Sequence, residues 1–165
     1  MSAASKMVFS ATLGLMILTA SGAMAADQAG VVLSLKGSAF ANDADGNLRP
    51  LKRGQEVFEK ELVCTDADSQ LQLKMKDGAL YTLKDRSRLD IETYQYEEGA
   101  PEKGAVSLNL VEGALRTVSG AVGKFNVEAY SLKAGTASIG IRGTEFEVAY
   151  SDAPATPLEE WCSRK

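Results

Sequence analysis

The chain has 165 residues, which is enough for one domain with a hydrophobic core. It contains no histidine, so Ser-His-Asp and Cys-His catalysis and every histidine-ligated metal site are excluded. The 18 Lys and Arg side chains against 22 Asp and Glu side chains give a net charge of −4, which argues against a surface that binds nucleic acid.

The first 25 residues have the pattern of a secretory signal peptide. Lys6 is the only charged residue in this segment, residues 8–18 are largely apolar, and the small-residue motif Ala23-Met24-Ala25 follows. We therefore predict cleavage after Ala25 and a periplasmic or secreted location. An uncleaved membrane anchor is the alternative, because about 20 uncharged residues can span a bilayer. Export also argues against a nucleotide as the ligand.

Residues 26–150 alternate apolar with polar or small side chains, with glycines between the runs. The alternating sets are Val31, Leu33 and Leu35; Leu71, Leu73 and Met75; Val106, Leu108 and Leu110; Ala137, Ile139 and Ile141; and Phe146 and Val148. A period of two predicts one all-β domain of many short strands, in a β-sandwich or β-solenoid-like arrangement. No convincing helical pattern is seen before residue 155.

Two segments of this region are similar at a spacing of 35 residues, namely residues 71–84 and 106–119. Such a period is typical of stacked β units, and chance similarity in a glycine-rich β-protein is the alternative. In the first copy, a three-residue loop ending at Gly78 in the left-handed region would place all its alternating apolar residues on one face. The second copy fits this rule less well, because the rule would turn Arg116 inward beside Leu108.

The only cysteines are Cys64 and Cys162. In an oxidising compartment, such a pair can form one disulfide. Cys64 also follows the apolar residues Leu62 and Val63, where a lone buried cysteine is ordinary. The sequence leaves both states open, and a metal site is not predicted because it would need further ligands.

The segment GTASIGIRGT invites comparison with a phosphate-binding loop because of its glycine spacing. Such a loop needs Lys and then Ser or Thr after its second glycine, whereas Ile141 and Arg142 follow here. We instead predict a structural corner, in which Gly140 and Gly143 allow a tight turn and Arg142 and Thr144 bond to nearby backbone. Contact of Arg142 with an anion or a partner is the alternative.

Carboxylate pairs could suggest glycosidase chemistry. The pairs are Asp66/Asp68, Glu97/Glu98 and Glu145/Glu147. Each lies in a turn-like stretch or faces solvent beside a strand, so we predict solvated acids rather than catalytic ones.

Two further segments have partial patterns of a calcium loop and of a sugar-binding platform. Asp43, Asp45 and Asn47 resemble the start of a calcium loop, but Gly54 occupies the twelfth position, which requires a bidentate Glu. Tyr94 and Tyr96 have the spacing of one strand face, for which we predict core or edge packing rather than a platform that binds sugars.

The C-terminal tail, residues 151–165, changes in character. Thr156 followed by Pro157 and Glu159 matches a helix start, with Thr156 as the N-cap. Any helix here is short and needs packing, for which Trp161 is the candidate.

Three stretches of the chain closely resemble the FecR domain family: residues 51–94, 106–120 and 134–148. The family pattern maps onto Gly54, Thr65, Ser69, Asp77, Gly78, Ser87, Arg88 and Leu89; onto residues 110–116, with Gly113 and Arg116; and onto residues 139–144, with Gly140, Ile141, Arg142, Gly143 and Thr144. The segment GIRGTEF is the most specific part. The resemblance implies an all-β extracytoplasmic domain, and we expect the motif residues to be structural.

In the iron-uptake regulators of that family, the domain takes a signal from an outer-membrane receptor and passes it through a membrane helix to a cytoplasmic sigma factor. Here we expect a signal peptide in place of the cytoplasmic segment and the internal helix, so direct control of a sigma factor is not expected from this chain. The family domain often adds a strand pair after the Arg-Gly-Thr corner, whereas this chain ends 21 residues beyond Thr144. We expect either that the tail closes the sheet differently or that an edge is left open for a partner.

These observations together predict a non-enzymatic binding or signalling module. Its expected partner is an envelope or outer-membrane protein, with no cofactor, metal, nucleotide or nucleic acid, and with the oligomeric state left open. A carbohydrate- or cell-wall-binding protein and a structural envelope subunit are the alternatives.

Overall fold

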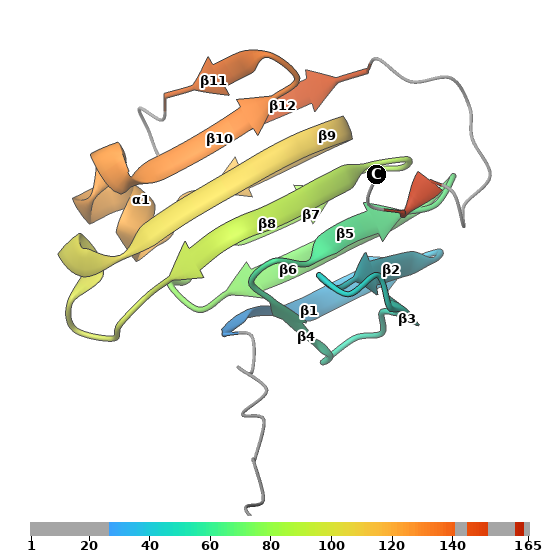
Figure 1. Ribbon diagram of the computed structural model, residues 1–165, viewed down its shortest axis with the longest axis horizontal. Coiled ribbons are helices and arrows are strands. Elements are labelled where there is room, and N and C mark those ends of the chain that lie inside the picture. The colour runs from blue at the N-terminus through green and yellow to red at the C-terminus, as the bar shows by residue number, and fades with distance from the viewer. Residues whose placement is uncertain (1–26, 141–144, 152–160, 164–165) are drawn as a thin grey trace, which may run out of the picture.

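The computed structural model describes residues 27–140, 145–151 and 161–163, as Figure 1 shows. The strands among these residues are β1 (Gln28–Lys36), β2 (Ala39–Asn42), β3 (Leu48–Pro50), β4 (Glu56–Phe58), β5 (Leu62–Thr65), β6 (Gln70–Met75), β7 (Leu80–Leu83), β8 (Arg88–Gln95), β9 (Ala105–Val118), β10 (Tyr130–Ala134), β11 (Ala137–Ile139) and β12 (Glu145–Tyr150). The helices are η1 (Pro101–Lys103), α1 (Ala121–Phe125) and η2 (Val127–Ala129). The predicted signal peptide and the predicted helix start at Thr156 lie outside the described residues. No helix in the described part is long and apolar enough to cross a bilayer.

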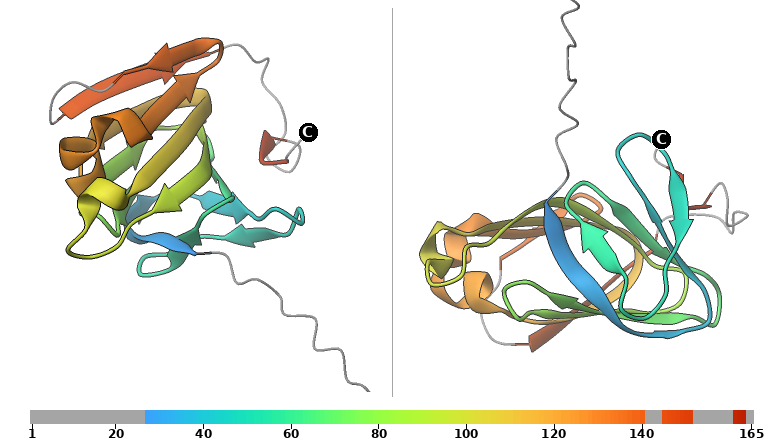
Figure 2. Two further views of the ribbon diagram at one scale, coloured as in Figure 1. Left: turned by 60° about the vertical axis from the view of Figure 1, so that its left-hand side comes forward. Right: turned by 90° about the horizontal axis from the view of Figure 1, so that it is seen from below.

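The strands form one curled sheet whose two halves share the long strand β9. The first part of β9 lies between β8 and β10, and its second part lies between β7 and β12. From β8 the sheet continues through β5 and β2 to β3, and from β7 it continues through β6 and β1 to β4. The halves curl toward each other as a half-barrel around the core (Figure 2). The prediction of an all-β fold is confirmed, and antiparallel pairing at all strand contacts except β9–β10 fits a sandwich-like arrangement rather than a solenoid.

The hairpin of β6 and β7 has the predicted three-residue loop. The Met75 N–H donates to the Ala79 carbonyl at 2.9 Å, the Gly78 N–H donates to the Met75 carbonyl at 3.0 Å, and Gly78 has φ +83°. All six residues expected on one face are buried: Leu71, Leu73, Met75, Ala79, Tyr81 and Leu83. The loop length therefore sets the register, because an odd number of loop residues keeps the apolar rows of both strands on the core side.

The second copy of the sequence repeat folds differently, as the continuous strand β9. Before Gly113, the even-numbered residues of β9 are buried, whereas Leu115 and Thr117 are buried after it. An irregularity in the pairing of β8 with β9 at this point and a φ of +91° at Gly113 account for the change of face. The poor fit of the second copy to the loop rule is explained in this way, because Arg116 is exposed after the bulge instead of pointing inward.

The prediction that the alternating apolar residues of β1 share one buried face was only partly right. Val31, Leu33 and Leu35 were expected on one face, but Val32 is 1% exposed and Leu33 is 38% exposed. The pairing of β1 with β6 shifts between Val32 and Ser34, so the strand changes face at this irregularity.

A short helix, α1, lies between β9 and η2 in a region where no helix was expected. It has five residues, too few to show a helical period in the sequence. Val122 anchors α1 in the core. The N–H groups of Ala121 and Val122, at the start of α1, donate hydrogen bonds to Asp77 in the β6–β7 loop.

Candidate functional site

Asp77 is buried and joins three parts of the fold through one side chain. One carboxylate oxygen accepts the Ala79 N–H at 3.0 Å and the hydroxyl proton of Tyr94. The other accepts the Val122 N–H at 3.1 Å, while the Asp77 carbonyl accepts the Ala121 N–H at 2.8 Å. Asp77 therefore closes its own loop and caps α1 at the same time.

Three buried tyrosines surround this contact. The Tyr81 and Tyr94 rings meet edge to face with centroids 6.5 Å apart, and the Tyr81 and Tyr130 hydroxyls lie 2.9 Å apart. Burial raises the pKa of Tyr81 and Tyr94, and nearby aromatic and acidic groups add to the shift. Burial likewise raises the pKa of Tyr130. Tyr94 is thus a core residue, and Tyr96 packs against the same core. The predicted packing role of these two tyrosines is confirmed.

The hydroxyl residues of the motif bind backbone groups where β5, β8 and β9 meet. Thr65 Oγ1 donates to the Lys84 carbonyl at 2.6 Å and accepts the Ser87 N–H at 2.9 Å. Ser87 Oγ in turn accepts the Ala114 N–H at 2.9 Å. A Cβ atom on Gly113 would lie 2.6 Å from the Arg86 carbonyl oxygen, so this crossing requires glycine for its spacing as well as its φ.

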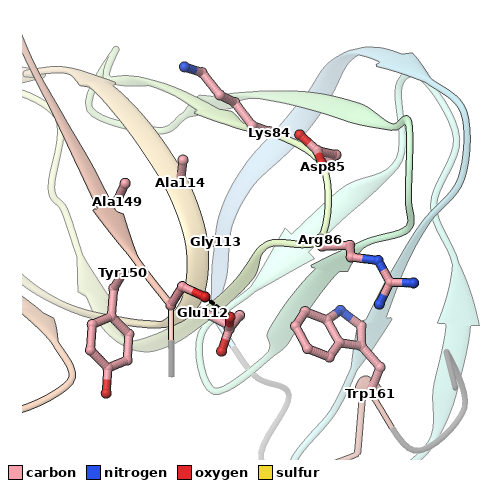
Figure 3. Close-up of a pocket in the computed structure, with 10 residues that line it drawn as sticks. Lys84, Asp85, Arg86, Glu112, Gly113, Ala114, Ala149, Tyr150 and Trp161 are labelled. Carbon is pink, nitrogen blue, oxygen red and sulfur yellow. Dashed lines mark hydrogen bonds between the residues drawn. The ribbon is translucent and has the colours of Figure 1, made fainter. Parts of the chain in front are cut away.

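Next to this crossing lies an open cleft of about 520 Å³ (Figure 3), here called the Trp161 cleft. The β7–β8 loop, the bulge of β9, the end of β12 and the C-terminal segment build its walls. The lining residues are Lys84, Asp85, Arg86, Glu112, Gly113, Ala114, Ala149, Tyr150, Ser151 and Trp161. Glu112 is buried and accepts a hydrogen bond from the Ser151 hydroxyl at 3.0 Å. The walls thus combine two aromatic side chains with charges of both signs.

Trp161 is held in place by covalent and polar contacts. Cys162 forms a disulfide with Cys64 on β5, and both cysteines are fully buried. The Arg88 guanidinium lies 5.4 Å from the Trp161 ring centroid and donates to the Ser163 carbonyl at 3.1 Å. Asn42 donates to the Cys162 carbonyl at 2.7 Å. Partial burial lowers the pKa of Arg88 against the opposing effect of nearby acids, with Glu112 first among them.

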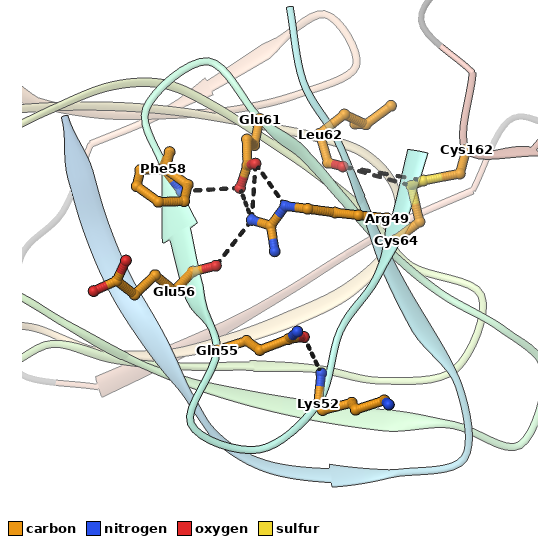
Figure 4. Close-up of polar contacts among 9 residues, drawn as sticks. All are labelled: Arg49, Lys52, Gln55, Glu56, Phe58, Glu61, Leu62, Cys64 and Cys162. Atoms are coloured by element: carbon orange, nitrogen blue, oxygen red, sulfur yellow. Dashed lines mark hydrogen bonds and ion pairs between the residues drawn. A yellow bond between two sulfur atoms is a disulfide. The ribbon is translucent and has the colours of Figure 1, made fainter. Parts of the chain in front are cut away.

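An ion pair that the sequence did not indicate lies near the disulfide, where β3 and the start of β5 flank β2. Glu61 is 3% exposed, and both of its carboxylate oxygens lie 2.8 Å from Arg49 Nη2 (Figure 4). The Phe58 N–H also donates to Glu61, at 2.9 Å. Arg49 and Glu61 are 12 positions apart on different strands or loops, so no local pattern could have connected them.

Three further acids make contacts at the surface of the described part. Arg116 binds Glu145 on β12, and Lys84 binds Glu147, across the outer face of the sheet. The Asn47 side-chain amide and the N–H groups of Asn47 and Asp45 donate to the Asp43 carboxylate in the β2–β3 turn, and these hydrogen bonds lower the pKa of Asp43. The Asp43 carboxylate therefore shapes its own loop.

The predicted glycine corner falls largely outside the described residues. Gly140 is exposed at the end of β11, and Ile141, Arg142, Gly143 and Thr144 are not among the residues described. The structural role expected for Arg142 stays a prediction. No signal in the sequence marked the Trp161 cleft, because its walls come from four segments that are distant along the chain.

Comparisons with known proteins point to one family. The model of the FecR protein family matches residues 61–157 of this chain. A solved structure described as "Cell surface anchoring domain" is 25% identical to the chain, with a TM-score of 0.38, and the match covers 39% of this chain and 84% of that one. No curated protein is significantly similar. The family match spans more than half of the chain, whereas the TM-score is too low to establish a common fold.

Proposed function

The chain belongs to the FecR family, and we propose that it is an extracytoplasmic binding or signalling module that acts without catalysis. Its partner is a protein of the bacterial envelope. The buried polar groups of the motif support this role, because Asp77, Thr65 and Ser87 are occupied by hydrogen bonds within the fold. They build the domain and are not available as acids or nucleophiles.

The Trp161 cleft is the proposed contact site. Tryptophan, tyrosine and arginine are the residues that most often dominate binding energy at protein interfaces. Here the exposed Arg86 and the half-buried Tyr150 line one open cleft with Trp161, which is itself buried, and the disulfide joins the segment that carries the indole to β5. A site ordered before binding loses less conformational entropy on association, so a rigid wall favours recognition of a protein segment. This aromatic cleft, with the disulfide beside Trp161, is the observation that carries the proposal.

Affinity capture with matched charge-reversal variants tests the site. Arg86 is exposed in the cleft wall, and Arg53 is exposed in the β3–β4 loop, which does not line the cleft. We expect Arg86→Glu to reduce recovery of the envelope partner by about tenfold or more, as at an interface hot spot. Arg53→Glu should leave recovery unchanged. Equal loss with both variants would remove the cleft from the proposal, and capture of no envelope protein by the unaltered chain would contradict the module itself.

The location is part of the same proposal. Residues 1–25 act as a cleaved export signal, supported by the apolar run and the small-residue motif that ends at Ala25. Mass spectrometry of the periplasmic or secreted fraction should find a chain that begins at Ala26. A membrane-bound chain that retains Lys6 would instead support the uncleaved anchor.

A further inference from the structure

β12 is the longest of the strands at which the curled sheet ends. The other three end strands, β3, β4 and β11, have three residues each, and Pro50 in β3 has no N–H to donate. Short strands and prolines are common protections of a sheet edge against pairing with another chain. β12 has six residues and neither protection, and among the described strands it pairs with β9 alone.

The outer face of β12 carries its charges in balanced pairs. Glu145 binds Arg116 on the neighbouring strand β9, and Glu147 binds Lys84, which directly follows β7 on the other side of β9. A charged residue pointing toward an approaching strand is one way in which proteins prevent edge pairing. Here each carboxylate already has a cationic partner within the sheet, so it opposes a further strand less than an unpaired carboxylate would, except where two carboxylates face each other directly.

The inner face of β12 carries apolar side chains. Phe146, Val148 and Tyr150 pack against the main core but remain partly exposed. A strand added beside β12 would place its own inward side chains next to this row, because paired strands share the alternation of faces. The fitting occupant therefore has apolar residues at every second position.

We propose that this occupant is a second copy of the chain, paired antiparallel through β12 about a two-fold axis at Val148. Directly opposite residues of antiparallel strands lie on the same face of the sheet. With Val148 on the axis, it meets Val148 of the second copy, and Phe146 meets Tyr150 of the second copy. The inner face then consists of apolar and aromatic pairs, which are the favourable cross-strand pairs.

Charge selects this register over the adjacent one. With Val148 on the axis, Glu147 lies opposite Ala149 of the second copy, and Glu145 lies opposite Ser151 of the second copy. With Glu147 on the axis, the two Glu147 carboxylates would face each other directly, and like charges in this position destabilise a sheet. β12 is thus complementary to itself in one register, and the pairing joins the β12 halves of two copies into one continuous sheet.

Substitutions at Ala149 test both the dimer and its register. Ala149 is exposed on the outer face, so either charge fits there in the folded chain. In the proposed register, Ala149→Lys places a cation opposite each Glu147, and we expect the dimer dissociation constant to fall roughly 2- to 30-fold. Ala149→Glu places a like charge opposite each Glu147, and we expect it to raise the dimer dissociation constant to a similar extent. Sedimentation equilibrium of the purified chain at low salt measures both constants.

Variants on a different edge provide the matched control. Ala137 is exposed on β11, and Ala137→Lys and Ala137→Glu should leave the dissociation constant unchanged. A chain that stays monomeric up to its solubility limit would overturn the proposal, as would a dimer that responds equally to both charges at Ala149. Misfolding cannot imitate the expected result, because it would not tighten the dimer. The measurement needs no envelope partner, so its outcome is independent of the function proposed above.

Discussion

Asp77 shows how a polar residue of the family motif acts at the scale of a single side chain. Its carboxylate accepts hydrogen bonds from the loop, from α1 and from the Tyr94 hydroxyl. A carboxylate with several donors organises buried backbone that would otherwise lack partners. The sequence placed Asp77 in the right loop, but its contacts with Tyr94 and Val122 depend on tertiary structure and could not be predicted.

The tyrosines around Asp77 predict that the protein loses stability in alkaline solution. Tyr81, Tyr94 and Tyr130 ionise near pH 10 when the chain is unfolded, and burial raises their pKa in the folded state. Below about pH 10 both states keep the protons, and above it only the folded state keeps them, so the unfolded state gains in relative stability. We expect the free energy of unfolding to fall by up to about 1.4 kcal/mol per pH unit for each buried tyrosine.

Denaturant titrations at several alkaline pH values measure this loss. Tyr94→Phe removes one of the titrating groups and should make the decline with pH less steep. Tyrosinate absorbance should remain incomplete until the protein unfolds. Ionisation of all five tyrosines near pH 10 in the folded protein would contradict the prediction.

At the scale of strands, the sequence predicted correctly which residues face the core where one loop fixes the register. It failed to do so where a bulge changes the face of a strand. The β6–β7 loop is local, so its length and its glycine were enough to predict which residues are buried. The bulges in β1 and β9 depend on neighbouring strands that lie far away in the sequence. Similar sequences in β6–β7 and β9 therefore fold as a hairpin and as one continuous strand.

Gly113 is the residue on which the bulge in β9 depends, and we predict that Gly113→Ala is strongly destabilising. Gly46 provides a matched control, because it has φ +87° with open space around it, whereas Gly113 has φ +91° beside Ser87 and Arg86. The left-handed backbone alone costs a non-glycine residue about 1–2 kcal/mol. Overpacking adds roughly 1–3 kcal/mol at Gly113 alone.

Urea unfolding of the two glycine variants separates these effects. The free energy of unfolding should fall further for Gly113→Ala than for Gly46→Ala. Equal losses in the free energy of unfolding would mean that the structure accommodates the new Cβ atom beside Ser87 without much destabilisation.

At the scale of the whole molecule, the sequence predicted the class of fold but not how the sheet closes. Alternating apolar residues identify strands, whereas the order of strands and the sharing of β9 arise from pairings across most of the chain. The two cysteines were compatible with a disulfide or with separate burial. The fold decides between these states because it brings β5 and the C-terminal segment together.

Removing the disulfide should release the wall of the Trp161 cleft. For the double variant Cys64→Ala and Cys162→Ala, we expect a loss of about 2–5 kcal/mol in the free energy of unfolding. Trp161 is the sole tryptophan and is 5% exposed, so its fluorescence should shift to the red as the segment becomes hydrated. Circular dichroism should show the β-sheet retained. An unchanged emission spectrum would mean that packing and the Arg88 contacts hold the segment without the bond.

The same disulfide also determines how the domain bears mechanical load. It joins residues separated by 98 positions, from the fifth strand to the end of the described chain. Tension applied between residues 27 and 163 passes directly from Cys64 to Cys162 through the covalent bond. Only β1–β5 lie on the loaded path, so pulling can peel these strands away while β6–β12 remain in an unstretched loop. An oxidised domain under tension would therefore extend by only the portion of its length that precedes Cys64.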